Sequence, residues 1–373
     1  MKTIPTANTI KSLSFILLFT ITSLSCYTLP DFTPTRQVRI QFVGDLMCHS
    51  SQISSYFDSK TKTYNSFKSF EYVSEILQNA NLTLGNLETT ISDNQSEFSG
   101  YPRFASPVGY VHGLKKAGFN ILSTANNHSA DTGPKGIDTT IRAVSENGMI
   151  PIGSYTSYED YQNRKDFIQD INGIKIALYN YTYSTNGIPV REGRIVRLLN
   201  EDQIKNDIDF AKANGAHFII LWYHYGTEYS EKPDQSQTKW VNLGINSGAD
   251  IIIGGHPHVV QKLDFYNDQN SNEQRLVAYS LGNFLSAQNR KFTDGGVILS
   301  FTLTLELGKK LVKKIEKVQT KSVWVDPRNY MIIPIQNYKQ REFPIQLPKH
   351  LEKRMFEYES YLKKIPGIGG SLF

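Results

Sequence analysis

From residue 38 to residue 253, short apolar runs alternate with amphipathic segments, and this alternation constrains the fold more than any other feature of the sequence. Strands that alternate with helices form a largely parallel sheet covered by helices, so the pattern predicts an α/β protein. The strands are apolar almost throughout, as expected of parallel strands that are buried on both faces. The predicted strands are residues 38–43, 82–84, 120–123, 174–179, 218–222 and 251–253, and the predicted helices are 70–78, 108–117, 134–146, 201–214 and 235–247.

After residue 256 the pattern changes to strands without intervening helices. Runs at 259–265, 276–280, 297–305 and 311–318 predict antiparallel strands joined by short turns. The segment 350–364 is amphipathic and is expected to dock as a terminal helix through Leu351, Met355, Tyr358 and Leu362. No linker-like run divides this part of the chain, which predicts one main domain over residues 38–320 and a C-terminal extension over 321–373.

The composition is that of a globular protein and argues against nucleic-acid binding. With 373 residues, 39% of them hydrophobic, the chain can bury a large core. The net charge is +5, but the Lys and Arg residues are scattered, and the densest group of lysines is expected on a solvated strand face or edge. That group consists of Lys309, Lys310, Lys313, Lys314 and Lys317.

The N-terminus has the order of a secretory signal. Lys2 and Lys11 precede an apolar stretch at 13–24, which is too short to span a bilayer. The stretch ends at Cys26 in a sequence that resembles a loose lipobox, so we predict a lipoprotein signal peptide over 1–26, lipidation of Cys26 and a tether over 27–37. An ordinary signal peptide cut near Ser25 is the alternative. Both predict export to the cell envelope, and lipidation adds a membrane anchor.

Polar side chains of ligand type follow the predicted strands, where open α/β sheets place their ligands. Five of the eight histidines lie in this setting, among glycines, Asn and Asp. Together with nearby carboxylates they form the mixed imidazole and carboxylate set that suits Zn, Mn or Fe. His256 and His258 are two residues apart, so an extended backbone would project both rings to one side. The candidates are Asp45, His49, Glu88, Asn127, His128, His224, His256 and His258.

A series of motifs, in order between residues 40 and 284, resembles the CapA-like (poly-gamma-glutamate capsule synthesis) family. They are Gly-Asp at 44–45, Asn-Leu-Glu at 86–88, Ala-Asn-Asn-His at 125–128, His-Tyr-Gly-Thr-Glu-Tyr at 224–229, Gly-Gly-His-Pro-His-Val-Val-Gln at 254–261 and Tyr-Ser-Leu-Gly-Asn-Phe at 279–284. The resemblance implies the fold of the calcineurin-like metallophosphatases. This is a four-layer α/β/β/α sandwich of two facing mixed sheets, instead of the single sheet that periodicity alone suggests.

The same resemblance implies roles for the candidate residues. Asp45 and His258 would hold a first divalent ion, and Glu88 would bridge to a second. Asn127, His224 and His256 would complete the second site, and His128 would protonate a leaving group or hold a transferred oxygen.

Two positions depart from the phosphatase pattern. Met47 stands where that pattern has a histidine, and Glu88 where it has an aspartate. His49 either replaces the missing ligand or faces away, so the number of ions is one or two.

Other marked residues have two interpretations each. Asp131, Asp138 and Glu228 either orient the histidines or, for Asp131, cap the helix that begins near Pro134. Arg103 either binds an anionic substrate or forms a structural salt bridge. Cys48 is expected to be a small buried residue and not a nucleophile.

Two hypotheses for the function remain. The first is a metal-dependent hydrolase or transferase that acts on a phosphoester or amide bond of an anionic capsule or envelope polymer, such as poly-gamma-glutamate. The second, which Met47 favours, is a non-catalytic surface lipoprotein that binds such a polymer with a degenerate metal site.

Overall fold

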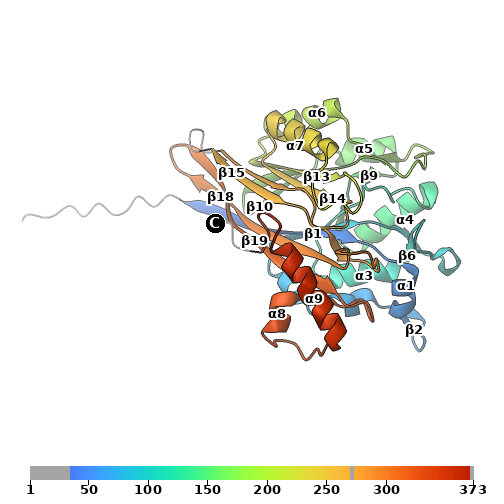
Figure 1. The fold of residues 1–373 in the computed structure, drawn as a ribbon. Helices are drawn as coiled ribbons and strands as arrows, with labels where there is room; N and C mark the ends of the chain where they lie inside the picture. The colour runs from blue at the N-terminus through green and yellow to red at the C-terminus, as the bar shows by residue number, and fades with distance from the viewer. Residues whose placement is uncertain (1–33, 269–272, 370–373) are drawn as a thin grey trace, which may run out of the picture. The chain divides into compact units, whose positions relative to one another are not determined.

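Two mixed β-sheets lie face to face at the centre of the protein (Figure 1). The computed structural model describes residues 34–268 and 273–369, so the predicted signal peptide and Cys26 lie outside the described residues. In the described part of the chain the first sheet has the order β20 (Ile332–Pro334), β19 (Leu311–Val325), β18 (Gly295–Leu307), β1 (Thr35–Leu46), β4 (Leu82–Leu87), β7 (Ile121–Ser123) and β8 (Ile150–Ile152), with β17 (Asn283–Leu285) also paired to β1. The second has the order β10 (Ile168–Ile171), β11 (Ile174–Thr182), β13 (Phe218–His224), β14 (Ile251–Gly255), β16 (Glu273–Ala278) and β15 (Leu263–Asp268).

The alternation of side chains along each central strand builds the layers. In β13, Phe218 and Ile220 point into the core between the sheets. Ile219 and Leu221 point outward and pack with apolar residues of α6 (Glu201–Ala213) and α7 (Gln235–Ser247). Burying each such side chain contributes roughly 1.5–3 kcal/mol. One apolar strand therefore joins two cores, which is why it has no polar face.

Helices cover the outer face of the first sheet in the same way. The sheet residues Val43 and Leu122 pack with Leu77 of α2 (Ser74–Gln78) and with Leu114 of α3 (Val108–Ala117), and α4 (Gly133–Glu146) adds Val144. The resulting order of layers is helix, sheet, sheet, helix. This confirms the four-layer α/β/β/α sandwich, and the single sheet suggested by periodicity is wrong.

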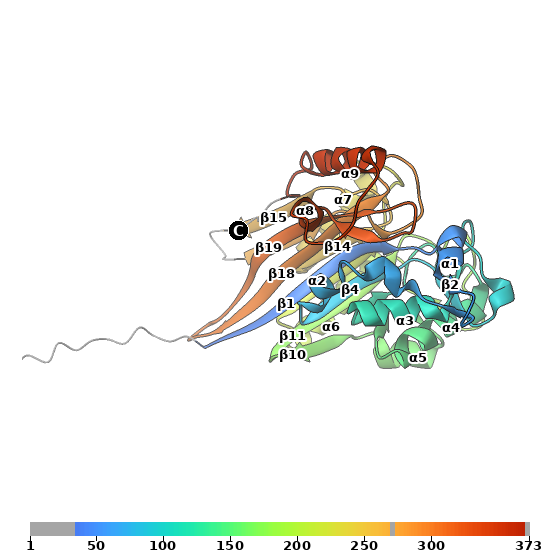
Figure 2. The same ribbon diagram turned by 90° about the horizontal axis from the view of Figure 1, so that it is seen from below.

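The C-terminal segment closes one end of the core. Leu351, Met355, Tyr358 and Leu362, the four residues predicted to share a face, all enter the core between the sheets from α9 (Lys349–Leu362). Figure 2 shows α8 (Ile335–Lys339) and α9 beside β18 and β19. The predicted domain boundary at residue 320 falls inside β19.

Several predicted element bounds differ from the structure. The predicted helix 70–78 is shorter, because residues up to Phe70 form a 3₁₀ helix, η1 (Ser66–Phe70), before α2. The predicted strand at 259–265 begins only at Leu263, since the positive φ angles of His256 (96°) and His258 (61°) turn the chain out of the extended conformation. β16 pairs parallel with β14, so the second half of the chain is not wholly antiparallel.

The shorter elements are α1 (Ser50–Tyr56), β2 (Phe57–Asp58), β3 (Thr63–Tyr64), β5 (Thr90–Ser92), η2 (Gln95–Glu97), β6 (Ala105–Pro107), β9 (Ser154–Tyr155), α5 (Tyr158–Arg164) and β12 (Ile195–Val196).

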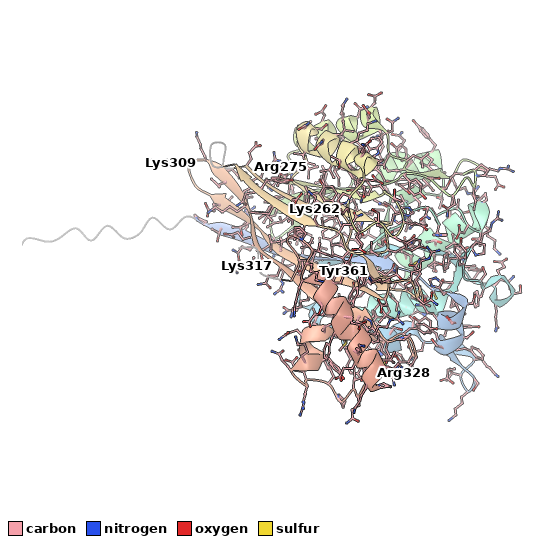
Figure 3. All side chains as sticks on the ribbon, in the orientation of Figure 1. Lys262, Arg275, Lys309, Lys317, Arg328 and Tyr361 are labelled. Carbon is pink, nitrogen blue, oxygen red and sulfur yellow. The ribbon has the colours of Figure 1, made fainter. Side chains whose placement is uncertain are left out.

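The dense group of lysines lies on the β18–β19 hairpin. Lys309 and Lys317 are exposed there (Figure 3). Lys313 forms an ion pair with Asp250, at 2.6 Å between Nζ and Oδ1, and Lys314 forms one with Glu306. Within residues 34–268 and 273–369, no helix is both long and apolar enough to cross a membrane.

A buried ion pair fastens α6 to the segment after β12. Arg197 donates to Asp207, and both side chains are 3% exposed. The hydroxyl of Tyr181 also donates to Asp207, and the Gln203 amide donates to Asp207 Oδ1 at 2.9 Å. Because the pair is desolvated, removing one charge leaves the other without compensation.

We expect Asp207→Asn to lower the free energy of unfolding by about 3–5 kcal/mol, as measured by urea denaturation. Glu201→Gln, also on α6, breaks an exposed pair with Lys239 of α7 and is the control, with an expected loss below about 1 kcal/mol. Equal, small losses in the two variants would show that Arg197 is not electrostatically dependent on Asp207.

Candidate metal centre

The six predicted ligands meet where strands of both sheets end. Asp45 lies at the end of β1, Glu88 follows β4, Asn127 follows β7, His224 ends β13, and His256 and His258 follow β14. All six residues are buried, with at most 3% exposure. Direct contacts join them into one cluster, whose members come from both sheets.

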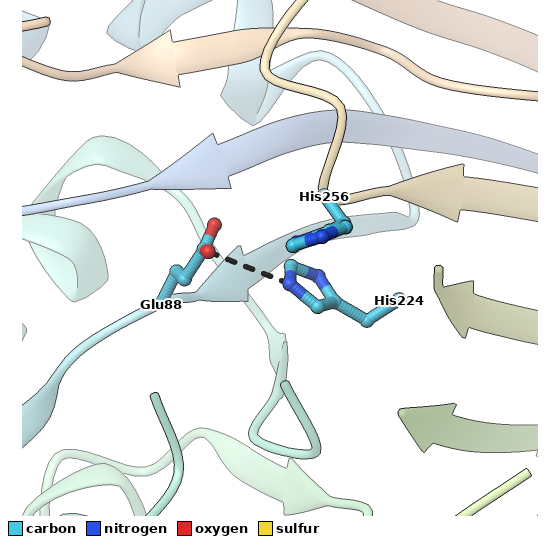
Figure 4. Close-up of side chains that lie close together, drawn as sticks. All are labelled: Glu88, His224 and His256. Atoms are coloured by element: carbon cyan, nitrogen blue, oxygen red, sulfur yellow. Dashed lines mark ion pairs between the residues drawn. The ribbon is translucent and has the colours of Figure 1, made fainter. Parts of the chain in front are cut away.

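Two groups of ligand-type side chains in this cluster share Glu88. One consists of Glu88, His224 and His256 and the other of Asp45, Glu88 and His258, and within each group the ligand atoms lie within 4.8 Å of one another. Figure 4 shows the Glu88 carboxylate facing His224, with Oε1 3.4 Å from Nε2, and the His256 ring beside it. Glu88 Oε1 is also 4.0 Å from His258 Nε2.

Unpaired polar atoms show that this donor set fits a cation. Both carboxylate oxygens of Glu88 and Nδ1 of His256 are buried without a hydrogen-bond partner among the described residues. Leaving such groups unpaired costs about 1–3 kcal/mol each, and more for a charged group. A divalent ion bound between them would remove that cost. The arrangement therefore supports the bridging position that the resemblance implied for Glu88.

The electrostatics of Asp45 favour its ionised form. Burial raises the pKa of this carboxyl, but the hydrogen bond from His258 and the charges of His224 and His258 outweigh burial and lower the pKa to about 2. The Asn86 amide also donates to Asp45 Oδ1 at 2.8 Å. Asp45 is thus held as an acceptor with a fixed orientation.

His258 carries the complementary charge. Burial lowers the pKa of this imidazole, but the negative charges of Glu88 and Asp45 raise it to about 9. Its Nδ1 lies 3.2 Å from Asp45 Oδ2 and 3.0 Å from Asn283 Oδ1. The carboxylates thus attract a positive charge, and because a metal ligand must be deprotonated, a bound cation would take the place of the proton.

The other two histidines of the cluster differ from His258. Burial and the neighbouring imidazoles hold the pKa of His256 well below its usual value, so this ring is neutral. His224 donates from Nε2 to Asn127 Oδ1 at 2.8 Å, and its Nδ1 contacts the Asn86 amide nitrogen at 3.2 Å. The His224 ring is therefore oriented by two buried amides.

His256 and His258 both reach the cluster, but not for the reason predicted from their spacing, which was an extended backbone that projects both rings to one side. Their backbone is not extended, and the two ring centroids are 6.0 Å apart. Each ring serves a different group, His256 with His224 and His258 with Asp45. The turn between the strands, and not strand alternation, brings both rings to the cluster.

His128 lies next to Asn127 and is held by Asp131. Its Nδ1 donates to Asp131 Oδ2 at 2.7 Å, and that oxygen also accepts from the backbone N–H of Phe104 at 2.7 Å. The Phe104 ring packs edge-on against the imidazole. Asp131 thus orients the histidine, while the N-cap residue of α4 is Thr132.

The remaining candidates lie outside the two ligand groups. His49 caps α1, with Nδ1 3.1 Å from Gln52 Oε1, and burial lowers its pKa to about 4. Arg103 and Glu228 are exposed, and Arg103 forms no ion pair with any described residue. Asp138 pairs with Arg194, at 2.5 Å between Oδ2 and Nη2, and does not orient a histidine. Cys48 is buried, and burial raises the pKa of its thiol, as expected for a structural residue.

Sequence reasoning missed the amides that hold the cluster together. Asn86 bridges Asp45 and His224, and its own Oδ1 accepts from Ser123 and Asn126. Asn283 likewise holds a ligand, since its Oδ1 lies 3.0 Å from His258 Nδ1. Asn86, Asn126 and Asn283 lie inside the motifs that carry the family resemblance, and this was the only signal for them.

Comparison with known proteins agrees with the motifs. Residues 39–288 match the family described as "Bacterial capsule synthesis protein PGA_cap". The capsule biosynthesis protein CapA of Bacillus anthracis is 28% identical over 276 residues, which cover 72% of this chain and 64% of that protein. The PGA biosynthesis protein CapA of Bacillus subtilis (strain 168) is 26% identical over 265 residues, which cover 70% of this chain and 67% of that protein. The chain thus spans about two thirds of the length of these relatives.

A solved structure supports the fold. The NAD nucleotidase NadN of Haemophilus influenzae superposes with a TM-score of 0.51, over 89% of this chain and 64% of that protein, at 13% sequence identity. At this identity the likeness concerns the fold alone, which is of the metallophosphatase type.

Close backbone contact explains the glycine before Asp45. A Cβ atom on Gly44 would lie 1.8 Å from the carbonyl oxygen of Gly282, and the same oxygen accepts from the Asp45 N–H at 3.0 Å. Any side chain at position 44 would push β1 away from the loop that precedes β17. Gly44 therefore sets the position of Asp45.

We expect Gly44→Ala to lower the free energy of unfolding by more than about 3 kcal/mol, because the clash is between backbones and cannot relax by a rotamer change. Gly133→Ala is the control, since no atom would lie within 4 Å of a methyl group at that position and only its φ of +72° opposes the change, at about 1–2 kcal/mol. Denaturant titrations of both variants decide, and equal losses would contradict the close-contact explanation.

Proposed function

Since the chain belongs to the bacterial capsule synthesis protein family, we propose that it is an exported, metal-dependent hydrolase or transferase that acts on an anionic polymer of the cell envelope. The observation that carries this proposal is the pair of buried ligand groups that share Glu88. A cluster with two carboxylates and three imidazoles, buried and partly unpaired, serves no evident packing purpose. Its donor types suit Zn, Mn or Fe, and its geometry suits one ion or two.

Asp45 and His258 would hold the first ion, Glu88 would bridge, and His224, His256 and Asn127 would hold the second. When bound, divalent ions lower the pKa of water and neutralise charge that develops at a tetrahedral centre. The Asn86 and Asn283 amides keep the ligand side chains in place, because each makes hydrogen bonds to a ligand and to a second buried group. Burial of all these side chains keeps bulk water away from the reacting atoms.

His128 is the residue that we propose to move a proton. Its Nδ1 is engaged by Asp131, which fixes the ring and leaves Nε2 as the nitrogen that faces a substrate. A leaving-group oxygen would take its proton from this atom. The carboxylate of Asp131 stabilises the charged ring before that transfer.

The names of the relatives support the substrate class. The two Bacillus proteins are named for capsule biosynthesis and for PGA biosynthesis, so the proposed substrate is poly-gamma-glutamate or a related anionic polymer, whose synthesis, anchoring or trimming needs a bond to be transferred or cleaved. The bond is a phosphoester or an amide, and the same metal chemistry serves both.

The same names support a location in the cell envelope. We propose that the chain is exported by its N-terminal signal and anchored to the membrane through lipid on Cys26. Mass spectrometry of the mature N-terminus tests this, since an unmodified terminus other than Cys26 would exclude the lipid anchor.

Met47 supports the second candidate function, a polymer-binding lipoprotein with a degenerate metal site. Its side chain is buried and accepts a contact from Ser286 Oγ at 3.6 Å to its sulfur, so no imidazole is available at this position. Full metal loading without turnover of any substrate would leave this candidate in place.

We expect Asp45→Asn and His258→Ala each to remove at least half of the bound metal, because each takes away a ligand and unbalances the charge at Glu88. Elemental analysis of the purified protein, after incubation with Mn²⁺ or Zn²⁺, measures the content. His350→Ala, which removes an exposed imidazole outside the cluster, should retain full metal content. Normal content in both ligand variants would falsify the ligand assignment.

His128→Ala should retain its metal and lose about 10²- to 10⁴-fold in turnover, the usual contribution of a positioned proton donor. The assays use bis(p-nitrophenyl) phosphate and poly-gamma-glutamate with the metal-loaded protein, and they also show which bond is cleaved. His112→Ala, at an exposed position of α3, is the control. An unchanged rate in His128→Ala would remove this residue from the mechanism.

A further inference from the structure

Two tyrosines flank the histidines of the metal centre. The Tyr183 ring lies 4.6 Å from the His256 ring and is 44% exposed. The Tyr229 ring lies 5.9 Å from the His258 ring, and its backbone N–H donates to the Pro257 carbonyl at 2.8 Å. Tyr229 is therefore fixed against the segment that carries both histidines.

A guanidinium is stacked on Tyr229. The Arg290 carbon Cζ lies 4.2 Å from the centroid of the Tyr229 ring. A cation–π contact of this kind uses none of the guanidinium's N–H donors in a hydrogen bond. Within the described residues Arg290 has no carboxylate partner, although the exposed Glu228 is the neighbour of Tyr229 in sequence. Its donors are available to a ligand.

The turn that carries Arg290 is fastened to the metal centre. Asn283, whose Oδ1 contacts His258 Nδ1, donates from Nδ2 to Gln288 Oε1 at 3.0 Å and to the Thr293 carbonyl at 2.8 Å. Thr293 in turn donates to the Arg290 carbonyl through its N–H and its hydroxyl. A single amide thus sets both the orientation of His258 and the start and end of the turn at 288–293.

We propose that Arg290 binds a second anionic group of the substrate, a carboxylate or a phosphate, next to the bond that is cleaved at the metal centre. The proposal deepens the proposed function and rests on it. A guanidinium fork matches either anion in a bidentate way. A substrate with repeated anionic groups would place one group at Arg290 while a neighbouring bond lies at the metal centre, so Arg290 would determine specificity for anionic polymers over neutral ones.

The test uses binding, which does not depend on turnover. 3-Phosphonopropionate offers a phosphonate to the metal centre and a carboxylate to Arg290, and the methyl ester of its carboxylate lacks the second charge. Calorimetry with the full, Mn²⁺-loaded chain should show the acid binding at least tenfold more tightly than the ester. Arg290→Met should abolish that difference and leave ester binding unchanged, and Arg290→Lys should restore part of it.

Lys291→Met is the matched control, because it removes the same charge one residue away. The Lys291 Nζ lies 4.6 Å from the Phe292 ring, and Lys291 lines a different cleft, along α9, in which Arg290 takes no part. This variant should discriminate between acid and ester as the wild type does. Ethane-1,2-bisphosphonate, which keeps the two-carbon spacing of the acid, shows by comparison whether Arg290 prefers a phosphate or a carboxylate.

Two results would overturn the proposal. One is a wild-type chain that binds acid and ester equally or binds neither. The other is an equal loss of discrimination in Arg290→Met and Lys291→Met, which would assign the effect to net charge. If the chain discriminates through Arg290 but cleaves no substrate, the anion site stands and the catalytic function fails. If it cleaves substrates but does not discriminate between acid and ester, the catalytic function stands and the anion site at Arg290 fails.

Discussion

The structure depends on the burial of two carboxylates, Asp45 and Glu88, where the two sheets meet. Water cannot solvate or screen the charge of either carboxylate, because both side chains are fully buried. Asp45 is compensated by protonated His258 and by the Asn86 amide, whereas Glu88 has no hydrogen-bond partner among the described residues. The two buried carboxylates therefore need compensating positive charge. The proton on His258 provides part of this charge, and a divalent cation held by the surrounding histidines and amides would provide the rest.

The local elements were predictable because their patterns are regular: the central strands β13 and β14 are buried along their whole length, and helices alternate with them. The runs at Val108–Ala117 and Gln235–Ser247 were predicted to the residue as α3 and α7. Their arrangement was not, since alternation along the chain says nothing about which sheet a strand joins. β7 and β11 have the same pattern yet belong to different sheets, and only the family resemblance implied two.

The candidate site was predictable as a set of residues and less so as a geometry. The six ligand candidates do come together, because parallel strands bring their ends to one edge. The positive φ angles at His256 and His258 could not be foreseen, since they depend on the close contacts of the neighbouring backbone. The supporting amides were missed for a related reason. An asparagine after a strand resembles an ordinary turn residue until its partners, often more than 30 positions away, are known.

β1 runs from the edge of the described chain to the ligand cluster. Its residues from Thr35 to Asp45 span about 33 Å, with the entry of the chain at one end and the ligand cluster at the other. The ligand cluster therefore lies at the end of β1 opposite to Thr35, on a strand that is held on both sides by its pairing with β4 and β18.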